Sequence, residues 1–125
     1  MKPMILTVPA QADWALVVRM AAAGAGALFD LPVDVLEDLR TALDESFDLL
    51  LHQDYCAETI TLCCEARSDG LHVSLTAQER TEQPCPDAAD ADIAQWIIGT
   101  LVREVNLEQD AQGVHCVRMT LPARG

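Results

Sequence analysis

The side chains able to do chemistry in this 125-residue sequence are thiols, imidazoles and carboxylates that mostly stand apart from one another. The five cysteines lack the paired spacing of a metal site, and Cys63 and Cys64 are neighbours on a predicted strand, where they point to opposite faces. The three histidines, His52, His72 and His115, fall on three separate predicted elements. We therefore predict no metal site and interpret the cysteines as thiols outside disulfides in a cytoplasmic protein.

A carboxylate and a hydroxyl stand side by side at Glu45 and Ser46, the pair of groups from which a base and a nucleophile could be made. Consecutive positions on a helix point about 100° apart, so this pair predicts no activated serine. From the residues alone, Glu45 is one of several solvent-facing carboxylates on a predicted helix.

The elements that must position these side chains begin with a short strand over Met4–Val8, closed by Pro9. Apolar residues at helical spacing then predict a helix from Ala10 to about Phe29 and, after the break at Leu31–Pro32, a second from Pro32 to about His52. The second helix has a continuous apolar stripe with polar residues opposite. The stripe consists of Leu36, Leu39, Leu43, Phe47 and Leu50.

The second half of the sequence alternates strand and helix signals. Period-two alternation predicts two strands, 59–66 and 71–76, joined by a turn at Ser68–Gly70. After a loop over 80–87, Asp87, Asp90 and Asp92 favour the start of a third helix, where negative charge suits the helix dipole. The predicted buried side of that helix consists of Ile93, Trp96, Ile97, Leu101 and Val105. Two strands, 106–109 and 114–121, close the chain as a hairpin.

This order of elements predicts an α+β fold, a two-layer sandwich in which helices cover one face of a mixed, mostly antiparallel sheet. Half of the residues are apolar, which is enough to bury one core. We therefore predict one domain over residues 1–125.

The charge balance limits the class of partner. Eight Lys and Arg stand against 20 Asp and Glu, for a net charge of −12. Nucleic acids are excluded because phosphate binding needs clustered cations, whereas a basic protein surface fits. No membrane span or targeting segment is expected, since Arg19 interrupts the one long apolar stretch, 14–29.

The order of elements and the run from Leu39 to Tyr55 resemble the anti-sigma factors and serine-protein kinases of the histidine kinase, gyrase and heat-shock ATPase (GHKL) superfamily. The resemblance covers nearly the whole chain and implies a histidine-kinase-like ATPase fold. In that family the second helix carries a Glu that acts as general base. Four residues later an Asn holds Mg²⁺ against the nucleotide phosphates, and a His and a Tyr often follow.

Laid on this pattern without gaps, Glu45 and Tyr55 match, while Leu49 stands at the Asn position and Gln53 at the His position. The family's glycine-rich phosphate segments have no counterpart, because no glycine occurs between residues 70 and 99. Losing about three hydrogen bonds to charged groups removes roughly 4.5–9 kcal/mol, and micromolar affinity is only about 8 kcal/mol. The resemblance therefore implies impaired or lost ATP binding.

A shift of the alignment by one residue is the other register. It pairs Asp44 with Asp48 and recovers His52, but it puts Leu39 and Leu43 out of step with the family's buried positions. We favour the ungapped register, and neither register completes the motif.

These features predict an anti-sigma-factor-like protein of transcription regulation that binds a protein partner, a sigma factor or an anti-sigma antagonist, without a cofactor. One alternative is an active serine/threonine-protein kinase that binds ATP and Mg²⁺ in a divergent pocket, with Glu45 as its catalytic base. Another is an acidic α+β domain for self-assembly. Members of the family form dimers, so the resemblance makes a homodimer one of the expected states of this chain.

Overall fold

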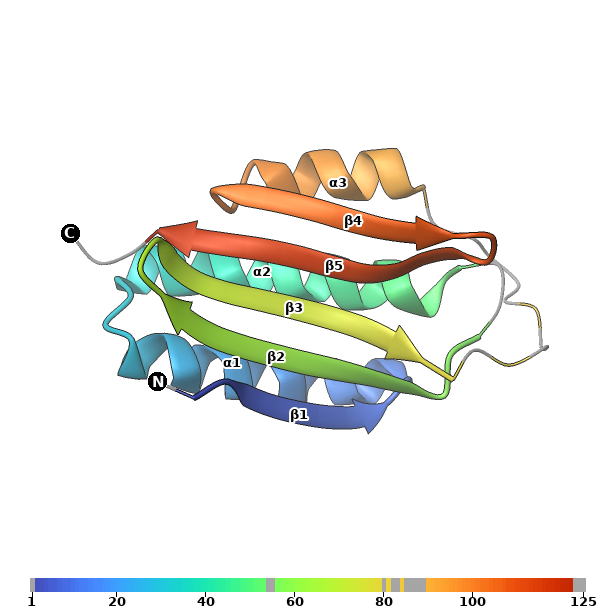
Figure 1. Ribbon diagram of the computed structural model, residues 1–125, viewed down its shortest axis with the longest axis horizontal. Helices are drawn as coiled ribbons and strands as arrows, with labels where there is room; N and C mark the ends of the chain where they lie inside the picture. Colours follow the sequence, from blue (N-terminus) through green and yellow to red (C-terminus); the bar gives the residue numbers. More distant parts are fainter. Residues whose placement is uncertain (1, 54–55, 80, 82–83, 85–89, 123–125) are drawn as a thin grey trace.

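The computed structural model describes residues 2–53, 56–79, 81, 84 and 90–122; Tyr55 and Asp87 lie outside them, as does most of the predicted loop. Within the described residues it contains a five-stranded sheet and three α-helices (Figure 1). The elements are, in chain order, β1 (Met4–Pro9), a short 3-10 turn η1 (Ala12–Trp14), α1 (Ala15–Leu28), α2 (Val33–Leu51), β2 (Thr59–Arg67), β3 (Gly70–Gln78), α3 (Ala91–Gly99), β4 (Glu104–Asp110) and β5 (Gly113–Pro122).

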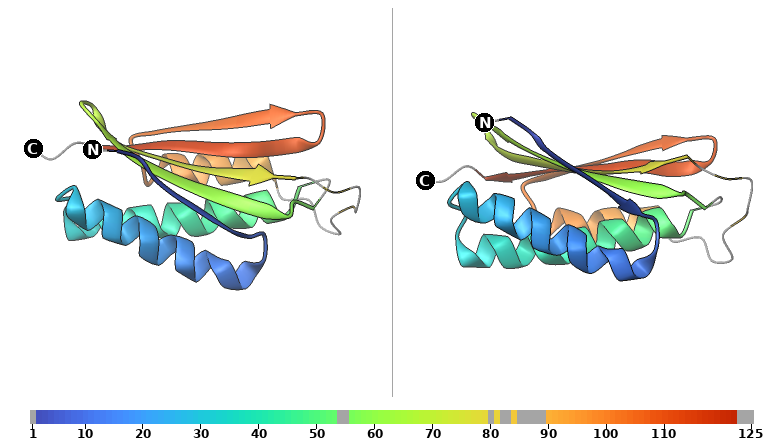
Figure 2. Two further views of the ribbon diagram at one scale, coloured as in Figure 1. Left: turned by 60° about the horizontal axis from the view of Figure 1, so that its bottom comes forward. Right: turned by 90° about the horizontal axis from the view of Figure 1, so that it is seen from below.

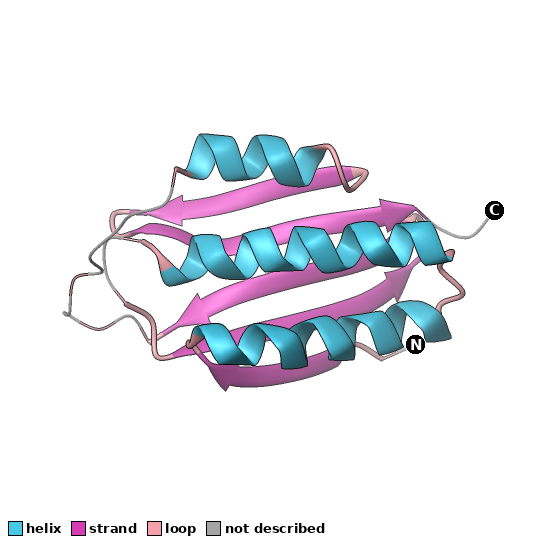
Figure 3. Cartoon of the chain, turned by 180° about the vertical axis from the view of Figure 1, so that it is seen from behind, coloured by secondary structure: helices cyan, strands magenta, loops and turns pink. Residues whose placement is uncertain are grey.

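The strands lie in the order β1-β2-β3-β5-β4, and the three helices cover one face of the sheet (Figures 2 and 3). Every neighbouring pair of described strands is antiparallel. The sequence predicted a mixed, mostly antiparallel sheet, and the described strands form antiparallel pairs throughout. The predicted two-layer α+β fold is confirmed. The sandwich thus has one sheet face under helices and one open face.

Alternation along β2 and β3 sets which side chains face the helices. Ile60 and Leu62 are completely buried on the inner face, whereas Thr61 and Cys63 are half-buried on the open face. In the register of β2 and β3, Thr59 lies opposite Gln78 at one end and Arg67 lies opposite Gly70 at the other, where the predicted turn closes the hairpin. The period-two pattern of the sequence therefore placed both strands and both faces correctly.

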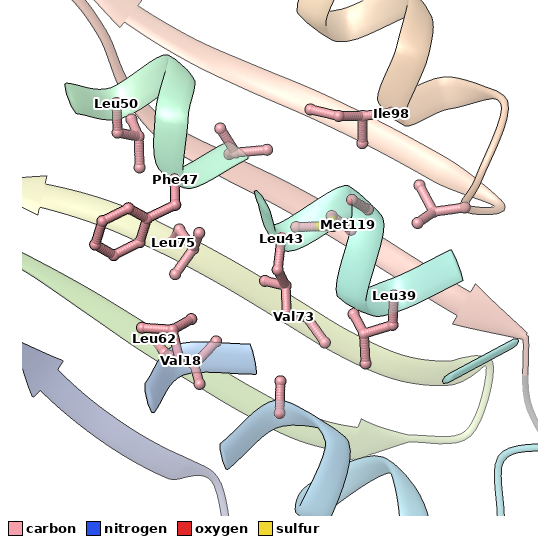
Figure 4. Close-up of a cluster of buried hydrophobic side chains, with 14 of the residues drawn as sticks. Val18, Leu39, Leu43, Phe47, Leu50, Leu62, Val73, Leu75, Ile98 and Met119 are labelled. Carbon is pink, nitrogen blue, oxygen red and sulfur yellow. The ribbon is translucent and has the colours of Figure 1, made fainter. Parts of the chain in front are cut away.

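The core lies between the sheet and α2, the central helix. The predicted apolar stripe is buried from its second member onward, at Leu39, Leu43, Phe47 and Leu50, and it packs against side chains of β2, β3 and β5 (Figure 4). Each such side chain contributes about 1.5–3 kcal/mol when it leaves water. None of the described helices is long and apolar enough to cross a membrane.

The helix α1 begins later than predicted and lies close to α2. Residues 12–14 form a 3-10 turn, and the α-helix starts at Ala15 rather than at Ala10. Its Ala- and Gly-rich half brings the helices together at Gly26, where a Cβ atom would lie 2.5 Å from Leu36 Cδ2. Nε of Arg19 lies 3.2 Å from the Asp44 carboxylate and links the two helices electrostatically.

The predicted buried face of α3 is wrong. Ala94 and Ile98 are the buried residues of this helix, whereas Ile93 and Trp96 are 57% and 75% exposed. Ile97 is half-buried at the border between the two faces. Because apolar side chains occur almost all round α3, helical spacing alone does not show which face turns inward.

The helix α3 is also shorter than predicted. Asp90 caps its start by accepting hydrogen bonds from the backbone N–H groups of Asp92 and Ile93, at 2.9 and 3.2 Å. The helix ends at Gly99, so Leu101 lies beyond it and Val105 belongs to β4, opposite Met119.

Candidate functional site

A groove between α2 and α3 gathers the one predicted catalytic residue with other carboxylates. Its volume is about 160 Å³. It is lined by Glu45, Asp48, Leu49, Asp90, Ile93, Ala94 and Ile97. Three acidic side chains thus surround a floor made of hydrocarbon, a combination that neither the charge count nor the helical patterns of the sequence revealed.

Helical geometry explains why these side chains meet. Glu45 and Asp48 are three residues apart on α2, so both lie on one flank of that helix, beside Leu49. Asp90 reaches the groove from the other side because it is the N-cap of α3. Ala94, whose side chain is small and buried, lets α3 approach α2 closely.

Leu49, at the position where the family resemblance places a magnesium-binding Asn, is 1% exposed and belongs to the hydrophobic core. Its side chain has no oxygen, and Mg²⁺ takes oxygen ligands. The residue therefore serves packing between α2 and its neighbours. At this position the described structure offers a metal ion no side-chain ligand.

Glu45 is half-exposed and borders the groove. Among the described residues, it takes part in no hydrogen bond or ion pair. Asp48, one turn further on, lies 3.3 Å from Nδ1 of His52. Glu45 is therefore a groove carboxylate that no described side chain engages, although Asp48 is the more exposed of the two.

Gln53, at the family's His position, has a structural role that sequence reasoning missed. Its side chain is buried, its Nε2 donates to the backbone oxygen of Leu49 at 2.8 Å, and its Oε1 accepts from the backbone N–H of Val114 at 2.9 Å. A Cβ atom on Gly113, whose φ is +108°, would lie 2.5 Å from Oε1. Gln53 thus joins the end of α2 to the start of β5.

The electrostatics of the groove favour cations. Glu45, Asp48 and Asp90 place negative charge around its mouth, and low-dielectric hydrocarbon beneath them strengthens their field. Pockets for small-molecule ligands usually measure about 300–1,000 Å³, so this groove suits one long side chain better than a nucleotide. Its chemistry fits a guanidinium or ammonium group.

The histidines and cysteines that the sequence singled out do not converge. His72 Nε2 lies 2.7 Å from Asp69, at the β2–β3 turn, and His115 lies 3.5 Å from Glu108 and Asp110 on the last hairpin. No group of three metal-binding side chains occurs in the part of the chain that the structure describes.

The adjacent thiols Cys63 and Cys64 point to opposite faces, as predicted. Cys63 borders a hollow on the open sheet face, and Cys64 is buried under the helices. Burial, with a smaller contribution from the neighbouring Cys63, raises the pKa of the Cys64 thiol to about 12. Cys64 therefore stays protonated and has the character of a core residue rather than of a nucleophile.

Two further hollows lie away from the α2–α3 groove. One, of about 190 Å³, lies on the open sheet face, where polar residues of β2, β3, β4 and β5 include Arg67, Glu104 and Arg118. The other, of about 350 Å³, is apolar and lies between α1 and the start of β1, beside Met20 and Gly24. Neither contains a residue that the sequence predicted to be catalytic.

No protein-family profile matches the sequence, and no curated protein matches it. Solved structures do match. A crystal structure of the RsbU and RsbW domains of Rv1364c from Mycobacterium tuberculosis superposes with a TM-score of 0.75 and 18% sequence identity over 99% of this chain. The chain spans 34% of the length of that protein chain.

At 18% identity the likeness shows the fold alone. It agrees with the GHKL-like two-layer sandwich that the sequence predicts. The roles of individual residues in the groove therefore depend on their own chemistry in this chain.

Proposed function

We propose that this protein is a regulator of the anti-sigma type that acts by binding a protein partner and that its α2–α3 groove does not hold ATP. One observation carries the proposal: hydrocarbon from Leu49 and carboxylates from Glu45, Asp48 and Asp90 line the place where the family resemblance puts magnesium and phosphates. The likeness in fold to a structure of RsbU and RsbW domains supports a role in partner switching.

The energetic argument against a nucleotide combines two losses. Mg²⁺ would lack an oxygen ligand at Leu49. The negatively charged triphosphate would also be repelled by the negatively charged carboxylates that line the groove. Each hydrogen bond to a charged group that is not made forfeits about 1.5–3 kcal/mol. A binding free energy of about 8 kcal/mol, which corresponds to micromolar affinity, leaves little after such losses.

Calorimetric titration of the purified chain with ATP and Mg²⁺ tests the nucleotide part of the proposal. We expect no saturable heat at micromolar to low millimolar ATP. A Leu49→Asn variant, which restores an amide oxygen at the position of the family's ligand, serves as a comparison. Tight saturable binding by the wild-type chain would contradict the proposal.

Affinity purification from the native cells tests the partner part. We expect a sigma factor or an anti-sigma antagonist to be retained by the tagged chain at low salt, where the attraction between an acidic surface and a basic partner is screened least. Retention of neither protein at low salt counts against an anti-sigma role.

The kinase alternative rests on Glu45, which is half-exposed at the mouth of the groove and is thus accessible to a substrate hydroxyl. Transfer of labelled phosphate from ATP to the captured partner is the assay. A general base contributes about 10²–10⁴-fold to rate, so activity that falls by this factor in Glu45→Gln would establish the kinase and overturn the non-catalytic proposal.

A further inference from the structure

The outer face of α3 is apolar and exposed. Ile93 and Trp96, three residues apart on this nine-residue helix, are 57% and 75% exposed. No described element covers them, although helical spacing predicted that both would be buried. Isolated exposed apolar residues are common, but a tryptophan and an isoleucine together beside a groove mark an interaction surface.

This apolar face continues into the α2–α3 groove. Ile93 belongs to both, because its side chain lines the groove as well as the exposed face. Across the groove, Glu45 and Asp48 on α2 supply negative charge. The combined surface thus has large apolar side chains on its α3 side, beside the N-cap carboxylate of Asp90, and two carboxylates on its α2 side.

Charge complementarity selects the occupant. A second copy of this chain, with its net charge of −12, would bring the same carboxylates against each other, and the two copies would repel. The negative charge of a phosphate-bearing ligand would be repelled by these carboxylates as well. A segment that carries positive charge next to large apolar side chains satisfies both sides at once. The groove volume of about 160 Å³ is well below the roughly 300–1,000 Å³ of small-molecule pockets and suits one long side chain.

We infer that the outer face of α3 and the α2–α3 groove form a docking site for a protein segment with arginine or lysine beside aliphatic or aromatic residues. The cationic group enters the groove between Glu45 and Asp48, and the apolar residues cover Ile93 and Trp96. The Trp96 ring also offers its face to a cation. This inference rests on the proposed function, since it names the chemistry of the partner that such a regulator binds.

Trp96 provides the readout. The chain has two tryptophans, so a Trp14→Phe variant leaves Trp96 as the one reporter of fluorescence. The probe is a synthetic 16-residue helical peptide with arginines along one face and leucines on the adjacent face. Its two controls have citrulline in place of arginine and serine in place of leucine. We expect the Trp96 fluorescence to change saturably as the probe peptide is added. Each control peptide should bind at least tenfold more weakly.

Matched variants of the full-length chain locate the site. Glu45→Gln/Asp48→Asn removes two charges at the groove, whereas Glu65→Gln/Glu104→Gln removes two at the hollow on the open sheet face. We expect the groove pair to weaken binding about tenfold and the control pair to leave it within twofold. All four side chains are at least partly exposed, so both variants should fold.

Several results would overturn the inference: equal affinity for the arginine and citrulline peptides, equal losses in both variant pairs, or no saturable fluorescence change. So would sedimentation that shows a dimer whose formation changes the Trp96 fluorescence, because a second copy would then cover this face. A partner captured in cells without peptide docking leaves the proposed function intact and overturns only this site. Conversely, tight ATP binding with docking retained overturns the nucleotide part of the proposal and not the site.

Discussion

Two residues in and just after α2, at positions that the family resemblance singles out, serve structure instead of chemistry. Leu49 fills the core where an amide oxygen would hold a metal ion, and Gln53 uses both ends of its side chain to bind backbone groups. Each side chain improves packing or hydrogen bonding at the end of α2. Both side chains thus stabilise the fold through packing and hydrogen bonds.

Substitution of Gln53 by Ala should destabilise the fold by about 2 kcal/mol or more. The change removes the side-chain hydrogen bonds to the backbone of Leu49 and of Val114, each worth about 0.5–1.5 kcal/mol, together with the packing of a buried side chain. Urea denaturation measures the loss. Gln112→Ala, an exposed position on the β4–β5 turn, is the control and should change the free energy of unfolding by less than about 0.5 kcal/mol. Equal effects would refute a structural role for Gln53.

The pair formed by His72 and Asp69 predicts a pH-dependent contribution to stability. The hydrogen bond from His72 is the main cause that lowers the pKa of the Asp69 carboxyl, and the positive charges of His72 and Arg103 lower it further. A carboxyl with a lowered folded pKa stabilises the fold above its unfolded pKa of about 4, and this contribution is lost as pH falls through the folded value. His72→Ala should therefore be less stable than wild type near pH 5.5.

Thermal unfolding at a series of pH values tests this prediction. The stabilities of wild type and His72→Ala should converge as pH falls through the lowered pKa of Asp69, because the carboxyl is then protonated in both proteins. Asp69→Asn should behave like His72→Ala, because either substitution removes the charged pair. A stability difference that stays constant from pH 5.5 to pH 2.5 would show that His72 acts through packing alone.

At the scale of elements, close approach of α1 and α2 predicts opposite effects at two glycines. Nothing lies within 4 Å of a Cβ built on Gly24, so Gly24→Ala should stabilise the fold by about 0.5–1 kcal/mol through helix propensity. At Gly26 a Cβ would meet Leu36 and Leu31, at 2.5 and 3.3 Å, and Gly26→Val should cost about 1–3 kcal/mol. Chemical denaturation of both variants provides the comparison, and a stabilising Gly26→Val would refute the close contact.

The elements that the sequence predicted best are those with one clearly apolar side. The α2 stripe from Leu39 to Leu50 and the alternation of Ile60 and Leu62 have polar residues opposite them, so one burial pattern is strongly favoured. In α3, by contrast, Ile93, Trp96 and Ile98 occupy different sides of a short helix. The orientation of α3 depends on its packing against α2 and β4. The spacing of apolar residues along the helix does not show which of its sides makes these contacts.

The site could be predicted only in part for a similar reason. The resemblance singled out Glu45, and in the structure this residue lies beside a groove, while its catalytic role stays a prediction. The groove itself depends on where α3 docks, which brings Asp90 and Ile93 next to α2 from far along the chain. The role of Gln53 depends likewise on β5, whose Val114 is 61 residues away. Long-range contacts of this kind leave no periodic trace in the sequence.

At the scale of the whole molecule, the two edges of the sheet differ. The β4 edge carries acidic residues at Glu104, Glu108 and Asp110 and an irregularity of register at Glu108/Gln109, features that discourage pairing with another strand. The β1 edge has no charge from Met4 to Pro9, and Ile5 is 65% exposed. The molecule thus has one protected and one unprotected edge.

We therefore expect association between copies during heating to start at β1. Ile5→Lys places a charge on the unprotected edge and should slow the growth of light scattering severalfold just below the unfolding transition, because strand addition would bury that charge. Asn106→Lys adds the same charge to the protected β4 edge and should leave the rate nearly unchanged. Since both positions are exposed, the unfolding temperatures should stay close to that of wild type. Equal slowing by the two substitutions would mean that net charge, reduced in magnitude by one unit in each, governs association rather than the β1 edge.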